Sequence, residues 1–256
     1  MDITFAATLP ADAPRLVARL VEQDKLPADL PAAASEGAAA ARFTGKAGQL
    51  FESFHADGGK LLRLALVGLG KGGDKNRQAS LEKAGAALSA RFLVSGESAL
   101  VLDVTGSGLK AAEVASVLLG ARLRAWRWDA YRTKLREEQK PTLTAITVVG
   151  APSGAEAAWQ DAAAVATGVE FTRELVAEPA NVIYPQTFVE RCQARFEGTG
   201  AEVQVLDEDE MRTLGMGSLL GVGQGSARDS KLLVIKWMGG NAGEAPLAFV
   251  GKGVTF

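Results

Sequence analysis

Strand-like apolar runs alternate with segments of helical periodicity along most of this chain, and this alternation limits the folds it can adopt. The apolar run 99–104 is followed by residues 109–126, where apolar side chains recur at helical spacing, and then by the strand-like run 143–149. The same alternation resumes after residue 179. Strands and helices in alternation are typical of α/β proteins. We therefore predict an α/β fold.

The first part of the chain, residues 1–150, is predicted to form one α/β domain. Leu16, Val17, Leu20 and Val21 fall at helical spacing and favour a helix over residues 14–25. Asp57-Gly58-Gly59 is a hairpin signal between two strands. The alanine-rich residues 38–41 have no clear pattern. The predicted strands are 3–7, 49–55, 60–69, 99–104 and 143–149, and the predicted helices are 14–25, 79–92 and 109–126.

A domain boundary is expected after residue 150. The breakers Ala-Pro-Ser-Gly at 151–154 precede a long helical pattern, which Glu178-Pro179 ends because the residue before proline avoids the helical region. We predict a first domain at 1–150, a linker helix at 151–178 and a second part at 179–256. The second part is predicted to contain helices at 186–196 and 207–214 and strands at 202–206, 219–222, 231–237 and 247–250.

Composition excludes several classes of protein. The chain is 47% hydrophobic and 23% charged, with a net charge of -2, so neither disorder nor a general polyanion-binding surface is expected. A single cysteine rules out an internal disulfide framework. There is no signal-peptide pattern and no apolar run of the roughly 20 residues that span a bilayer. We expect a soluble cytoplasmic protein with no membrane partner.

Gly68, Gly70 and Gly73 have the G-x-G-x-x-G spacing between a predicted strand and a predicted helix. Glycines in that context let the backbone approach a pyrophosphate at the amino end of a helix. A dinucleotide site also needs an acidic residue about 20 positions later, and Asp103 comes too late. We favour a structural turn here, with nucleotide binding as the alternative.

The chain has one histidine and one cysteine. His55 alone cannot form an H-E-x-x-H zinc site, and no G-x-S-x-G motif accompanies it, so we expect a surface residue beside a turn. Cys192 shares a predicted helix face with Phe188, Val189 and Phe196, which favours a buried apolar cysteine over a nucleophile.

Two charged segments could carry function. Trp126, Trp128 and Tyr131 are interleaved with arginines at 124, 127 and 132, a pattern that can bind nucleic acid but is more often core with a solvated rim. The acidic run 207–210 could serve acid–base chemistry or a metal. At a helix start, carboxylates more simply interact with the positive end of the helix dipole, and we favour that role.

Lys252 stands between Gly251 and Gly253, just after residues 248–250, which are predicted to end a buried strand. It could be a solvated lysine on a turn. It could also give its lone pair to a metal or take a proton, provided that burial or a nearby cation lowers its pKa from the ordinary value near 10.4. The residues alone leave both interpretations open.

Three segments in order give the chain a family resemblance. Residues 173–181, Arg-Glu-Leu-Val-Ala-Glu-Pro-Ala-Asn, are followed by Pro185; residues 214–226 are Leu-Gly-Met-Gly-Ser-Leu-Leu-Gly-Val-Gly-Gln-Gly-Ser; and residues 250–256 are Val-Gly-Lys-Gly-Val-Thr-Phe. These segments resemble the leucyl aminopeptidase family, also called cytosol aminopeptidases. The first domain is similar more loosely, mainly around residues 126–134. The similarity implies a macro-domain-like first domain, then the first part of an α/β metallo-aminopeptidase domain.

The resemblance implies a specific site. Lys252 matches a metal ligand of the family, whose next ligand is an aspartate directly after the phenylalanine at 256. The family uses two divalent metal ions, Mn²⁺ or Zn²⁺, acts on peptide substrates with a free amino terminus and assembles as a homohexamer. Its other metal ligands, its catalytic lysine and its catalytic arginine have no counterpart here, so no catalytic residue is expected within this chain.

We therefore expect an amino-terminal fragment of a dinuclear-metal leucyl aminopeptidase, inactive by itself and cut inside the metal-binding signature. The alternative is a non-catalytic nucleotide- or DNA-binding module. The pI of about 5.7 argues against a nucleic-acid partner.

Overall fold

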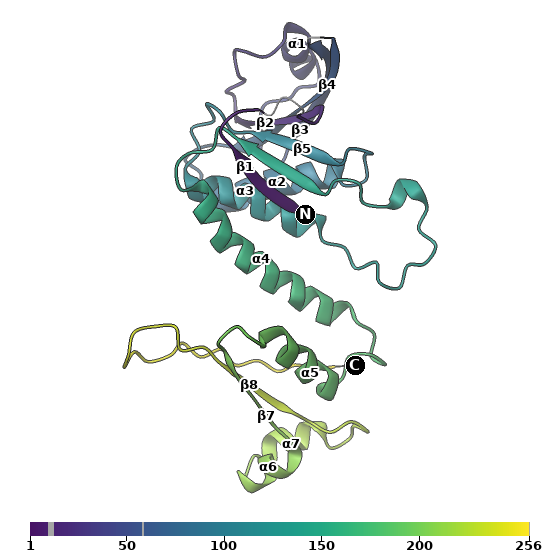
Figure 1. Ribbon diagram of the computed structural model, residues 1–256, viewed down its shortest axis with the longest axis vertical. Helices are drawn as coiled ribbons and strands as arrows, with labels where there is room; N and C mark the ends of the chain where they lie inside the picture. The colour runs from purple at the N-terminus through teal and green to yellow at the C-terminus, as the bar shows by residue number, and fades with distance from the viewer. Residues whose placement is uncertain (10–12, 58, 256) are drawn as a thin grey trace. The chain divides into compact units, whose positions relative to one another are not determined.

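The structure is a computed structural model that describes residues 1–9, 13–57 and 59–255, without the side chain of Asp57. The chain divides into two compact units, Met1–Phe171 and Thr172–Phe256 (Figure 1). We describe each unit by itself. We predicted a first domain at 1–150, a linker helix at 151–178 and a second part at 179–256. This division stays a prediction, because it states which parts fold independently.

Unit 1 is built on a six-stranded, mostly parallel sheet, which confirms the predicted α/β class. In the sheet the order is β1-β6-β5-β2-β4-β3, and only the neighbours β3 and β4 are antiparallel. Figure 1 shows the parallel strands with helices against the sheet. The strands are β1 (Asp2–Ala6), β2 (Leu16–Glu22), β3 (Leu50–Asp57), β4 (Lys60–Gly70), β5 (Ala99–Asp103) and β6 (Ala145–Val149).

Alternate side chains of the strands enter two separate cores. Ala65, Val67 and Leu69 of β4 lie in the larger core with α2, α3 and the start of α4, whereas Leu64 and Leu66 lie in a smaller core with α1. Alternation along a strand sends neighbours to opposite faces, so helices cover both faces of β4. The helices of unit 1 are α1 (Ala32–Ala40), α2 (Arg77–Phe92), α3 (Ala111–Ala125) and most of α4 (Ala155–Ala177), with a 3-10 turn η1 (Glu137–Gln139).

The helix predicted over residues 14–25 is wrong, because residues 16–22 of this segment form the central strand β2. Leu16, Ala18 and Leu20 are buried at a spacing of two, and Val17 pairs with both β4 and β5. The apolar pairs at 16–17 and 20–21 fit helical spacing, but they fit equally well a short strand that is covered on both sides. Tertiary pairing decided between the two.

Helices α2 and α3 pack with their backbones in close contact. A Cβ atom on Gly85 would lie 1.7 Å from the carbonyl oxygen of Val117, and one on Gly120 would lie 1.9 Å from that of Glu82. Such distances leave no room for a side chain, so glycine is required at both positions. The predicted apolar face of α2, including Leu81, Leu88 and Phe92, is buried in the larger core.

The remaining predictions for unit 1 agree with the structure. The hairpin between β3 and β4 pairs Asp57 with Lys60, and the predicted turn residue Gly58 lies outside the described residues. The unassigned alanine-rich patch belongs to α1. The long helix predicted from residue 155 is α4, and Arg122 of α3 binds Glu170 of α4 through two nitrogens, at 2.9 and 2.7 Å.

Within its described residues, 172–255, unit 2 contains two strands and three short helices after the end of α4. The strands β7 (Glu202–Leu206) and β8 (Leu232–Lys236) form an antiparallel pair. The helices are α5 (Pro185–Phe196), α6 (Glu208–Thr213) and α7 (Gly217–Gly223).

Two strands predicted in unit 2 are wrong. Residues 219–222 lie in helix α7, because a short apolar run between glycines carries no period that separates helix from strand. Residues 247–250 form no strand, and the side chains of Leu247, Phe249 and Val250 are 82, 89 and 97% exposed instead of buried. A strand needs a neighbour to satisfy its backbone, and no described residue pairs with this segment.

Candidate functional site

Lys252 lies in an extended segment of unit 2 that follows β8 and has no regular secondary structure. Its side chain is exposed, and its flanking glycines have open space at their Cβ positions. Among the described residues, the Lys252 amine makes no hydrogen bond or ion pair. The Lys252 side chain is therefore accessible to solvent, and none of the described residues holds its amine in a fixed position.

The donor set around Lys252 does not fit a pair of divalent ions. Such ions need several oxygen donors held in a fixed geometry. In the described part of the chain, no group of three or more histidine, cysteine, aspartate or glutamate residues is arranged to hold a metal. Lys252 alone offers one nitrogen, so no chemical step can be derived at a metal from the residues described.

The acidic run 207–210 caps a helix, as predicted. Asp207 is the N-cap of α6, and its carboxylate accepts hydrogen bonds from the backbone nitrogens of Asp209 and Glu210 at 3.0 and 2.9 Å. Glu210 in turn accepts from the backbone nitrogen of Asp207. This reciprocal capping box accounts for two of the four acidic side chains without a metal.

One buried ion pair in unit 2 escaped the sequence analysis. Glu178, interpreted only as a helix end, has a buried carboxylate 2.6 Å from Nη2 of Arg191 on α5. The pair ties the turn at residues 178–184 to the helix that follows. The separation of thirteen positions carries no local signal, so only the fold could bring these two residues together.

Packing accounts for Gly68 and backbone conformation for Gly70 in the 68–73 motif, whereas Gly73 has open space at its Cβ position. A Cβ atom on Gly68 would lie 2.1 Å from the backbone oxygen of Lys46, and one on Gly72 would lie 2.1 Å from Oε1 of Glu22. Gly70 has a φ of +73°, a backbone conformation that favours glycine. These contacts support the structural turn over a nucleotide site.

His55 and Cys192 show no catalytic arrangement. His55 is half-buried on β3 rather than at the surface, and its Nδ1 has no hydrogen-bond partner among the described residues. Because His55 lies on a strand that pairs with β4, it is more buried than its position beside a turn had suggested. Cys192 is buried as predicted, and burial raises the pKa of its thiol, which opposes formation of a reactive thiolate.

The aromatic residues after α3 form one cluster. The rings of Trp126 and Trp128 lie 6.4 Å apart and nearly parallel, and Tyr131 meets Trp128 edge-on at the same distance. Tyr131 is 57% exposed, whereas both tryptophans are half-buried. The cluster lies after the end of the helix, outside both cores, and not in the core as we had favoured.

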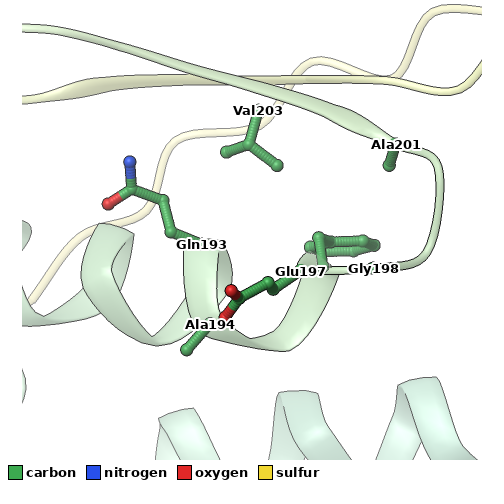
Figure 2. Close-up of a pocket in the computed structure, with 7 residues that line it drawn as sticks. Gln193, Ala194, Glu197, Gly198, Ala201 and Val203 are labelled. Atoms are coloured by element: carbon green, nitrogen blue, oxygen red, sulfur yellow. The ribbon is translucent and has the colours of Figure 1, made fainter.

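Two surface hollows lack a catalytic constellation. The first, of about 470 Å³, lies where α5 ends and the chain turns into β7 (Figure 2), and its only polar side chains are Gln193 and Glu197. The second, of about 430 Å³, lies at the carboxyl ends of β1 and β6, where Glu156 is the only charged lining residue. Neither brings an acid, a base and a nucleophile together.

The local geometry does not identify a family for this chain, but comparison with known protein families does. Residues 13–135 match the model described as "Cytosol aminopeptidase family, N-terminal domain", and residues 170–256 match the one described as "Cytosol aminopeptidase family, catalytic domain". The two models cover most of the chain in order. Among the described residues, no helix is long and apolar enough to cross a membrane.

Curated relatives carry the same family name. A probable cytosol aminopeptidase of Caulobacter vibrioides is 43% identical over 85% of this chain and 44% of its own length, and one of Rhizobium etli is 40% identical over 90% and 46%. The chain thus spans about half the length of the curated relatives it matches.

Solved structures agree with the fold. A tomato leucine aminopeptidase mutant matches with a TM-score of 0.75 at 22% identity, over 91% of this chain and 50% of that one. The bottromycin maturation enzyme BotP in complex with Mn matches with a TM-score of 0.70 at 27% identity, over 87% and 45%. With two family models, curated relatives and this fold in agreement, the chain belongs to the cytosol aminopeptidase family.

Proposed function

We propose that this chain supplies the N-terminal domain and part of the catalytic domain of a metal-dependent aminopeptidase that removes amino-terminal residues, leucine among them, from peptides. The order of the two family matches and the names of the curated relatives support this proposal. Those names also support a cytoplasmic location. Assembly as a homohexamer stays a prediction from the family resemblance.

Within this function we assign Lys252 the role of a metal ligand. The observation that carries the assignment is an exposed lysine between two glycines, inside the segment matched by the catalytic-domain model. A lysine must lose its proton to offer a lone pair, and a nearby divalent ion lowers its pKa strongly. Lys252 by itself has no such neighbour, so residues 1–256 alone are expected to be inactive and to bind metal weakly.

The metal is proposed to be a pair of divalent ions, manganese or zinc. The manganese complex of BotP supports a divalent ion for a relative of this fold. Both metals therefore need to be tested with this protein. The partner carboxylates are proposed to come from polypeptide outside the 256 residues, because the described residues contain no suitable cluster.

The test compares residues 1–256 with the longest natural polypeptide that contains this sequence, each loaded with manganese or zinc. Only the longer protein should hydrolyse a leucyl amide. Its Lys252→Ala variant should lose both activity and bound metal, measured by elemental analysis. Lys236→Ala is the matched control, because this exposed lysine pairs with Glu202 at 3.0 Å and with no other residue in the described part of the chain. An active, fully metallated Lys252→Ala protein would refute the assignment.

A further inference from the structure

Strand β3 forms one edge of the six-stranded sheet in unit 1. Within the described residues it pairs with β4 alone, and its eight residues make it longer than the average strand. Natural proteins often protect such edges with short strands, prolines or bulges, because an open edge pairs with other chains. β3 contains no proline, and its register with β4 is unbroken from Leu50 to Asp57. It therefore lacks these protections.

The hydrogen-bond pattern shows which backbone groups of β3 face outward. In an antiparallel pair, consecutive residues direct their N–H and C=O groups alternately toward the partner strand and away from it. Gly68 donates a 2.8 Å hydrogen bond to the carbonyl of Gln49, just before the strand begins, so the odd-numbered residues of β3 face β4. The residues that face outward are Leu50, Glu52, Phe54 and Ala56. No backbone hydrogen bond joins these four to another described residue, so they can bind an extended peptide.

Exposed apolar side chains accompany this edge on one face of the sheet. Phe54 and Leu61 are 53 and 54% exposed, and Ala56, which pairs with Leu61, is exposed as well. Phe54 belongs to neither core, and the Arg63 guanidinium lies 5.4 Å from the centre of its ring. An aromatic ring beside unpaired backbone groups offers an added strand apolar contact as well as hydrogen bonds.

Three arginines and two glutamates form a cluster beside Phe54 that has one excess positive charge. Glu52 binds Arg63 and Arg91. Glu97 binds Arg63 and Arg15. The Arg91 side chain is 46% exposed, and in the described part of the chain its guanidinium donates a hydrogen bond only to Glu52. Because a guanidinium has five N–H groups, Arg91 can also bind an acidic side chain of a partner.

We propose that β3 binds an extended segment of another protein, which joins the sheet as an antiparallel strand, the more stable of the two pairings per residue. The segment carries an apolar residue opposite Phe54 and an acidic residue opposite Glu52, where it balances the excess charge through Arg91. Side chains two positions apart share one face of a strand, so the partner motif is apolar-x-acidic. A second copy of β3 would bring the same excess positive charge, which favours a different protein.

The test measures binding of residues 1–256 to the peptide acetyl-Lys-Thr-Val-Thr-Ile-Thr-Glu-Thr-amide by fluorescence anisotropy, with the label on its lysine. The isoleucine is designed to lie opposite Phe54 and the glutamate opposite Glu52. N-methylation of the isoleucine and the glutamate removes two donors that face β3, and should weaken binding about tenfold or more. N-methylation of the two threonines that flank the isoleucine is the matched control, because their donors face away. The acetyl group removes the free amino terminus that a substrate of the proposed aminopeptidase needs, so the outcome does not depend on that function.

Variants of the protein locate the bound peptide. Phe54→Ser should weaken binding about fivefold or more, whereas Val165→Ser, which alters a 58% exposed valine on α4, should not. Arg91→Gln should weaken binding of the glutamate peptide more than that of a peptide with glutamine in its place.

Three results would overturn the proposal. The first is no binding of the peptide at about 1 mM protein. The second is equal binding of the two N-methylated peptides, and the third is equal binding by the Phe54→Ser and Val165→Ser proteins. A dimer of the unaltered chain that Phe54→Ser dissociates would also overturn it, because the occupant of the edge would then be a second copy.

Discussion

Arg63 carries a full charge into unit 1, where opposite charges and aromatic rings surround it. Its guanidinium lies 3.0 Å from Glu52 and 3.4 Å from Glu97, and 4.9 Å from the ring centre of Phe92. Arg91 also binds Glu52. Burial alone would raise the pKa of Glu52, but the hydrogen bonds from Arg91 and Arg63 lower it below its ordinary value. A buried charge is tolerated only when it is paired in this way.

We predict from this cluster that acid destabilises unit 1 through Glu52. A carboxyl group with a lowered pKa in the folded state stabilises the fold above its unfolded pKa, and this contribution is lost as the pH falls through the folded value. Glu52→Gln should therefore lower the free energy of unfolding by about 1–2 kcal/mol at pH 7, a cost typical of a charged hydrogen bond. The difference from the unaltered protein should shrink as the pH falls below about 4.

Urea denaturation at a series of pH values measures this effect. Glu36→Gln is the matched control, because Glu36 lies exposed on α1 and has no partner among the described residues. Its unfolding free energy should follow that of the unaltered protein at every pH. A Glu52→Gln difference that stays constant down to low pH would show that the ionised carboxylate does not cause the effect.

At the scale of the elements, contact between backbones fixes how α2 and α3 lie on the sheet. Gly85 and Gly120 leave each helix free to approach the other, and the buried Ser89 hydroxyl donates a 2.7 Å hydrogen bond to the Ala121 oxygen across the contact. Gly168 in α4 is different, because a Cβ atom there would meet nothing within 4 Å. The helical glycines thus have different structural roles: Gly85 and Gly120 allow two helices to pack closely, whereas Gly168 does not.

We expect Gly120→Val to disrupt unit 1, and Gly168→Ala to be tolerated. A side chain at 120 must push α2 away from α3, at a cost of about 3 kcal/mol or more. An alanine at 168 fits the open space and should raise stability by up to about 1 kcal/mol through helix propensity. Thermal unfolding of the two variants distinguishes these cases. Similar melting temperatures would contradict the close packing.

The segment 247–250 should become a strand once a neighbour is present. Leu247, Phe249 and Val250 are almost fully exposed, although their apolar pattern favours a buried strand. In the longest natural polypeptide that contains this sequence, we expect slow amide hydrogen exchange at these residues, and fast exchange in residues 1–256 alone. Equally fast exchange in both would show that this segment is a loop.

For the whole molecule, the division into units passes through a continuous helix. The first compact unit ends at residue 171 and the second begins at residue 172. Helix α4 runs from Ala155 to Ala177, so it contributes residues to both units. Nη2 of Arg122 donates to Thr167 and Glu170, at 3.0 and 2.7 Å, so these contacts hold most of α4 against α3. The hydrogen bond with Glu170 also raises the pKa of Arg122.

Limited proteolysis should therefore release a stable amino-terminal piece of about 150–175 residues, an ordinary size for a domain. Arg122→Ala should move the cleavage toward the start of α4, because the helix loses its anchor on α3. Mass spectrometry of the products locates the cut. Cleavage spread evenly over both units would argue against the predicted division.

Local sequence alone determined those features of this protein whose cause lies within a few residues. Asp207 caps α6 through its own neighbours, the β3–β4 hairpin follows from its turn residues, and α2 follows from one apolar face. The motifs at 173–181, 214–226 and 250–256 were enough to indicate the family. The order of elements was therefore largely predictable from sequence.

Tertiary structure decided what depends on partners distant in the chain. Residues 16–22, inside the predicted helix, became a strand because β4 and β5 pair with both edges, and residues 247–250 remained without a strand because none of the residues that the structure describes pairs with them. The Glu178–Arg191 pair has the same kind of cause, and so does the half-burial of His55. Lys252 shows the limit most clearly: the sequence identifies it as a candidate ligand, but a metal site needs several donors in one place, and only the fold can assemble them.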